Sequence, residues 1–84
     1  MDWDCVRRQM SKTLENQTIN IYGPKIFKHL KFHTPHFNPL HLYEIKSAAE
    51  LTSLTMAAEI KIGENEMKKM EEALYKILET CMKK

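Results

Sequence analysis

The sequence predicts an all-α protein, a small four-helix bundle that forms a single domain over residues 1–84. Apolar residues recur at steps of three and four through most of the chain, which is the period of a helix. The two glycines and three prolines are too few for a turn-rich all-β fold. A chain of 84 residues also has no room for a separate cofactor domain. We therefore expect one compact domain of packed helices.

The first predicted helix covers residues 2–16. Its apolar positions share one helical stripe: Trp3, Val6, Met10 and Leu14. Asp2 and Asp4 suit its first turn, where the helix dipole favours negative charge. The pattern then breaks, and residues 17–23 are interpreted as an extended connector.

A second, short helix is predicted over residues 24–33. Pro24 follows Gly23, and the fixed φ of proline suits the first position of a helix. Thr34 precedes Pro35, and a residue before proline disfavours helical geometry, so the helix ends there.

The third helix is predicted over residues 39–62 and carries two apolar stripes on nearly opposite sides. One stripe consists of Leu40, Tyr43, Ser47, Leu51, Leu54, Ala58 and Ile62; the second consists of Leu42, Ile45, Ala49, Thr52, Met56 and Ile60. A helix that is apolar on two sides is expected to be buried on two sides. This helix is therefore predicted to lie at the centre of the fold.

The fourth helix is predicted over residues 65–83 with a single apolar stripe, and Gly63 is interpreted as the residue that ends the third helix. The short turn between the two helices indicates an antiparallel hairpin.

The second stripe of the third helix is the main candidate binding surface. Its predicted interface residues are Leu42, Ile45, Ala49, Met56 and Ile60. In a monomer, the short second helix and the 17–23 connector would have to cover this stripe, and their length falls short. We favour a homodimer in which the stripe meets its copy across a two-fold axis.

The segment of residues 22–43 is a second candidate, because it combines lysines and aromatic residues without any acid. Lys25, Lys28 and Lys31 with an exposed Phe32 would suit nucleic acid, through phosphate contacts and base stacking. In the alternative, Phe32 turns into the core. We favour the core position, because three lysines and a net charge of +2 fall short of a strongly basic domain.

Metal binding and catalysis have little support. His29 and His33 are four residues apart and His36 is near, a spacing that suits zinc, but spacing alone is a weak signal. No metal or other cofactor is predicted. No nucleophile with a base and an oxyanion site stands out, so the protein is not expected to be an enzyme.

Cys5 and Cys81 are the two cysteines. The N-terminal residues lack an apolar signal core, so we expect an intracellular protein that is not secreted, with both thiols free. Cys5 falls on the polar side of the first helix and is expected to be exposed. No apolar run is long enough to form a transmembrane segment.

The sequence therefore predicts a small non-enzymatic protein-interaction or adaptor module. Its expected partners are a second copy of itself, in a homodimer, and another protein. The alternative is a nucleic-acid-binding regulator that uses the segment of residues 22–43.

Overall fold

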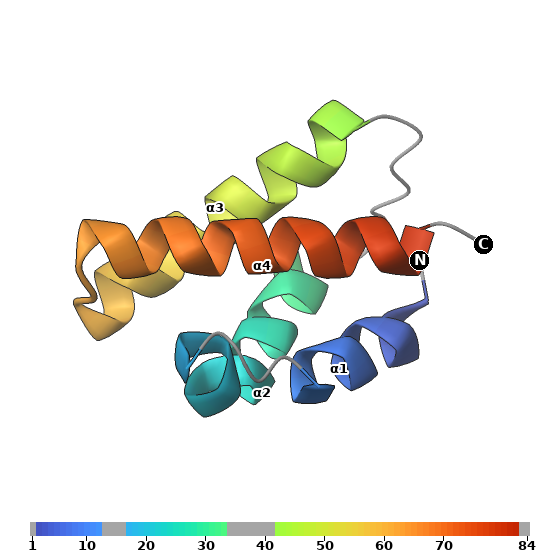
Figure 1. The fold of residues 1–84 in the computed structure, drawn as a ribbon, viewed down its shortest axis with the longest axis horizontal. Helices are drawn as coiled ribbons and strands as arrows, with labels where there is room; N and C mark the ends of the chain where they lie inside the picture. The colour runs from blue at the N-terminus through green and yellow to red at the C-terminus, as the bar shows by residue number, and fades with distance from the viewer. Residues whose placement is uncertain (1, 13–16, 34–41, 83–84) are drawn as a thin grey trace.

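The computed structural model describes residues 2–12, 17–33 and 42–82, and these form four helices with 94% helical content and no strand. The helices are α1 (Trp3–Lys12), α2 (Gln17–His33), α3 (Leu42–Ile60) and α4 (Glu64–Met82). The prediction of an all-α four-helix bundle is confirmed. Figure 1 shows α4 running across the molecule, with α3 crossing behind it and α1 and α2 below it.

The first helix begins where its sequence provides a cap. The backbone N–H of Cys5 donates a hydrogen bond to a carboxylate oxygen of Asp2 at 3.1 Å, which satisfies one of the unpaired N–H groups at the helix start. Asp4 lies in the first turn and forms an exposed ion pair with Arg7 at 3.7 Å. The predicted end of this helix, residues 13–16, lies outside the described residues.

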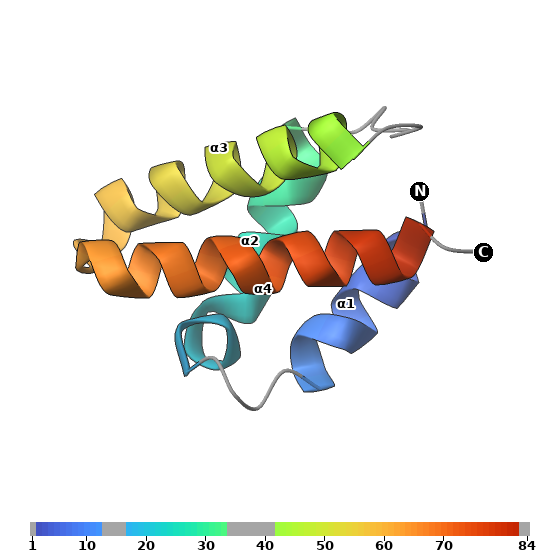
Figure 2. The ribbon, with the colours of Figure 1, turned by 45° about the horizontal axis from the view of Figure 1, so that its top comes forward.

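The second helix is longer than predicted. It begins at Gln17 and continues through Pro24, so the interpretation of residues 17–23 as an extended connector is wrong. Gly23 lacks a Cβ, which removes part of the clash that a proline makes with the residue before it. Pro24 still deprives one turn of its hydrogen bond, and such a gap bends a helix. Figure 2 shows this change of direction along α2.

The hairpin of α3 and α4 is confirmed, because these two helices pack on each other more extensively than any other pair. The turn differs in detail from the prediction. Lys61, with a φ of 54°, is the residue in the left-handed region after α3, and Gly63 is not. The carbonyl of Gly63 instead accepts a hydrogen bond from the backbone N–H of Met67 at 3.0 Å. Gly63 is therefore the N-cap residue of α4.

The core receives side chains from all four helices. Its largest fully buried side chains are Val6, Ile19, Ile26, Leu30, Ser53, Met56, Met70, Leu74 and Leu78. A disulfide between Cys5 and Cys81 joins the beginning of α1 to the end of α4, with their Cα atoms 5.7 Å apart. The bundle is thus closed covalently near the two ends of the chain.

Candidate interaction surfaces

The face of α3 that the sequence predicts as an interface lies inside the molecule. Ile45, Ala49 and Met56 are buried, because α4 packs along this face and α2 reaches it near Met56. At the two ends of the stripe, Leu42 is exposed and Ile60 is half-buried. The assignment of this stripe to an interface with a second chain is therefore corrected, since its central residues have no free surface.

The burial of this stripe has a simple physical reason. The helical hairpin brings α4 along the stripe, so α2 does not have to cover it alone. With 17 residues, α2 is also longer than the short helix that the sequence predicts. The central stripe of α3 is thus buried within a single chain.

The opposite stripe of α3 is the exposed one. Its members within α3 are Tyr43, Ser47, Leu51, Leu54 and Ala58, which we call the α3 outer face. The exposed fractions of Tyr43, Leu51 and Leu54 are 78%, 54% and 55%. Single exposed apolar residues are common, but several on one helix face are typical of a binding surface.

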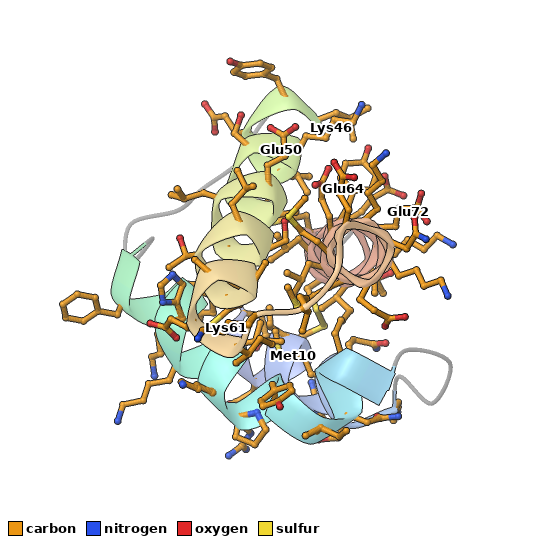
Figure 3. The ribbon with its side chains drawn as sticks, turned by 90° about the vertical axis from the view of Figure 1, so that its left-hand side faces the viewer. Met10, Lys46, Glu50, Lys61, Glu64 and Glu72 are labelled. Carbon is orange, nitrogen blue, oxygen red and sulfur yellow. A yellow bond between two sulfur atoms is a disulfide. The ribbon has the colours of Figure 1, made fainter. Side chains whose placement is uncertain are left out.

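Charged residues lie at the two ends and along one edge of the α3 outer face. Glu44 is close to the beginning of α3, and Lys61 directly follows its last residue. Within the part of the chain that the structure describes, neither side chain takes part in an ion pair. Lys46 and Glu50 project from α3 on the side of the molecule from which Glu72 projects from α4 (Figure 3). The two ends of α3 therefore have opposite charges beside them.

Sequence reasoning identified both stripes but chose the wrong one as exposed. Each stripe contains two small residues, so the signal that distinguishes them is the small residues beside the second stripe, Ala48 and Ser53. The buried side of α3 is rich in small residues, with Ala48, Ala49, Thr52 and Ser53 all buried. Small side chains allow a neighbouring helix to approach closely, so they mark the side on which α4 packs.

The basic and aromatic surface of α2 is the second candidate. Phe32 is 77% exposed, so the predicted position of this ring in the core is wrong. Lys28 and Lys31 are exposed beside it, and Phe27 is half-buried. A shallow hollow of about 490 Å³ is lined by these four side chains.

Two of the lysines on α2 already have contacts within the molecule. Lys25 forms an ion pair with Glu59 of α3 at 3.5 Å. The ammonium of Lys31 lies 5.8 Å from the ring centre of Phe27, which in turn meets Trp3 edge-to-face at 6.1 Å. The surface around Phe32 is therefore less basic than the number of lysines indicates.

The predicted histidine site is only partly covered by the structure. His29 is half-buried on α2, and His33 ends that helix, but the side chain of His33 and the whole of His36 lie outside the described residues. Among the residues that are described, no group of three or more metal-ligating side chains could hold an ion. Zinc binding by the three histidines stays untested.

The prediction of free thiols is wrong, because Cys5 and Cys81 form a disulfide. Both residues are buried, so the predicted exposure of Cys5 is also wrong. Cys5 lies beside Val6 at the edge of the core, where the last turn of α4 packs over α1. Neither sulfur is available as a nucleophile in this state.

Among the residues that the structure describes, Tyr75 has a shifted pKa. Burial raises the pKa of Tyr75 on α4 above its ordinary value of 10.0, and a hydrogen bond and the negative charge of Glu79 add to this effect. Tyr75 lines a small hollow between α3 and α4, together with Lys46 and Lys76. The raised pKa favours the neutral form of the phenol.

No protein-family model matches the sequence, and comparisons with curated proteins and with solved structures find no match either. Among the described helices, none combines the length and the apolar character that crossing a membrane requires. The function must therefore be argued from the surfaces of the molecule.

Proposed function

We propose that the protein is a small, non-enzymatic interaction module that acts as a homodimer through the α3 outer face. The observation that supports this most directly is the exposure of Leu51 and Leu54 in the middle of a 19-residue helix. Contact with a second copy would remove both leucines from water. The favourable free energy of association scales with the apolar area that is buried. The absence of an enzymatic role is part of the proposal, and the pairing of both cysteines in a disulfide supports it.

A second copy of the chain is the partner that the charges favour. Glu44 lies near the beginning of α3 and Lys61 directly after its end, so two α3 helices can meet with unlike charges together. Two-fold contacts of this kind bring the same patch of each chain together. The further protein partner that the sequence predicts has no surface assigned to it and stays a prediction.

The test is a change of assembly state without a change of fold. Replacing both leucines, Leu51→Glu and Leu54→Glu, should convert the dimer into a monomer in sedimentation experiments while the helical circular dichroism is retained. The matched control is Leu42→Glu, since Leu42 is 59% exposed on the same helix but lies outside the α3 outer face. A wild-type chain that sediments as a monomer at high micromolar concentration would refute the dimer.

Nucleic-acid binding is the second candidate function, and the exposure of Phe32 beside Lys28 and Lys31 favours it. An exposed aromatic ring beside lysines provides base stacking and phosphate contacts for single strands. Lys25 is held by Glu59, so we expect two phosphate contacts per chain. The logarithm of the affinity should then fall with the logarithm of the salt concentration with a slope of about −1.4 per chain, at roughly −0.7 per contact.

A labelled oligothymidylate tests this second function by fluorescence anisotropy. Phe32→Ala should weaken binding by about 1–3 kcal/mol, the usual contribution of a stacked base. Ile21→Ala is the control, because Ile21 is an exposed apolar residue of the same helix that does not line the hollow beside Phe32. Equal effects of the two variants, or no binding at low salt, would dismiss a nucleic-acid role.

The disulfide also bears on where the protein is found. Disulfides persist in oxidising compartments and are rare in the cytosol, where thiols are kept reduced. The bond between Cys5 and Cys81 therefore argues against the reducing compartment that the sequence predicts. The intracellular location stays a prediction.

A further inference from the structure

The α3 outer face has the spacing of a coiled-coil seam. Glu44, Leu51 and Ala58 are seven residues apart, and so are Ser47, Leu54 and Lys61. The two sets alternate at steps of three and four, which is the a and d pattern of a heptad repeat. Within α3 the residues at the a positions are thus Glu44, Leu51 and Ala58, and those at the d positions are Ser47 and Leu54. Lys61 has the spacing of the next d position, but it lies just after the last helical residue and has a left-handed φ of 54°.

We propose that two copies of the chain pair through α3 in antiparallel orientation, with the two-fold axis passing the helix between Thr52 and Ser53. This inference rests on the proposed function, since it requires that the α3 outer face binds a second copy. In an antiparallel helix pair, the a positions of one chain lie opposite the d positions of the other. Leu51 then faces the partner's Leu54, and the same contact is repeated on the other side of the axis.

The remaining contacts are matched in size and in charge. Ser47 faces the partner's Ala58, so small residues meet where the helices approach most closely. Glu44 faces the partner's Lys61 at each end of the contact. The beginning of one helix also lies beside the end of the other, an arrangement in which the two helix dipoles attract each other.

The charges select the antiparallel orientation over the parallel one. In a parallel pair, identical residues would lie opposite each other, so Glu44 would face the partner's Glu44 and Lys61 would face the partner's Lys61. Both contacts would be repulsive, and like charges across an interface suppress the wrong arrangement. The antiparallel pair replaces two repulsive contacts with two attractive ones.

The position of α3 in the fold permits this contact. Figure 2 shows α3 along the upper edge of the bundle, with α4 and α1 below it. The helix of 19 residues is roughly 28 Å long, at 1.5 Å per residue. A contact along one helix lies at the small end of stable interfaces, so we expect a dissociation constant on the order of micromolar.

Charge reversal tests the orientation. Glu44→Lys alone and Lys61→Glu alone should each weaken the dimer about three- to ten-fold, because each places two like-charged pairs at its ends. The double variant restores both attractive pairs and should return to within about two-fold of the wild type. Dissociation constants from sedimentation at low ionic strength provide the measurement, and circular dichroism confirms the fold of each variant.

The controls separate failure of the orientation from failure of the dimer. Lys12→Glu, on α1, makes the same change in net charge as Lys61→Glu and should leave the dissociation constant unchanged. A parallel pair would respond little to either single reversal, since like charges already face each other in it. If the single variants have no effect while Leu51→Glu with Leu54→Glu still gives a monomer, the dimer stands and the antiparallel register is wrong. If no variant and no wild-type chain dimerises, both proposals fail.

Discussion

Two neighbouring residues of α3 lie in opposite environments. Met56 has 0% of its side chain exposed, whereas Leu54, two positions earlier, is 55% exposed. In sequence the two are both apolar and equally compatible with a core position. At 100° per residue they are separated by more than half a turn, so only the packing of α4 and α2 decides which of them is buried. Whether a residue is buried or exposed in a helix with two apolar stripes therefore depends on which helices pack against it.

This difference predicts different energetic effects. Met56→Ala should lower the free energy of unfolding by about 2–5 kcal/mol, because it leaves a cavity in the core. Leu54→Ala should change it by less than about 0.5 kcal/mol, as is usual for surface substitutions. Urea denaturation provides the measurement, at protein concentrations below the dissociation constant of the dimer so that the loss of a dimer contact does not contribute.

The opposite ranking of the two substitutions would mean that the buried and the exposed stripe of α3 are exchanged. If Leu54→Ala were the more damaging change in the monomer, α3 would present the stripe that contains Met56 to solvent. The interface predicted from the sequence would then apply again.

At the scale of the helices, periodicity predicted most of the fold. The hairpin of α3 and α4 follows from two long apolar patterns joined by a short turn, and α4 buries the stripe expected of it, including Met70, Leu74 and Leu78. These elements could be predicted because local spacing and tertiary packing demand the same structure.

The errors occur where a local signal has two meanings. Pro24 suits the start of a helix, but a proline is also tolerated inside a bent helix when the surrounding packing holds the remaining turns. Ile19 is fully buried in the first part of α2, and this burial stabilises the turns before the proline. Likewise, the exposed ring of Phe32 depends on where α2 meets α3, which no local pattern reports. The candidate surfaces could therefore be found as patterns but not assigned as inside or outside.

The proline in α2 leads to a second prediction. Pro24→Ala should raise the free energy of unfolding by about 1–2 kcal/mol, because the helix regains a hydrogen bond and loses a steric clash while the unfolded chain becomes only slightly more flexible. Pro24 is exposed, so few contacts are lost. Urea denaturation measures the change.

Asn20→Ala is the matched control. Asn20 is exposed and contributes the carbonyl that Pro24 leaves without a helical N–H. This variant keeps the proline and should gain only the difference in helix propensity, about 0.5 kcal/mol. A loss of stability in Pro24→Ala would instead mean that the bend is required for α2 to pack against both α1 and α3.

At the scale of the whole molecule, the small size of the protein limits its stability. A chain of 84 residues buries a modest fraction of its surface on folding, and small domains often rely on a covalent link. The disulfide between Cys5 and Cys81 closes a loop with a sequence separation of 76 residues, almost the entire chain. A cross-link over such a long loop restricts the unfolded state strongly, which raises the free energy of unfolding.

The last prediction concerns this link. Reduction by dithiothreitol, or the double substitution Cys5→Ala with Cys81→Ala, should lower the free energy of unfolding by about 4 kcal/mol, the loop-closure value for a chain segment of this length. Thermal and urea denaturation with and without reductant provide the measurement. The double variant is its own control, because dithiothreitol should have no further effect on it. If the reductant leaves the wild-type protein equally stable and both thiols react with a labelling reagent once the protein is unfolded without reductant, the bond is not formed, and the free thiols expected from the sequence would be correct. A stability loss confined to the wild type instead establishes that the bundle depends on the bond between its first and last helices.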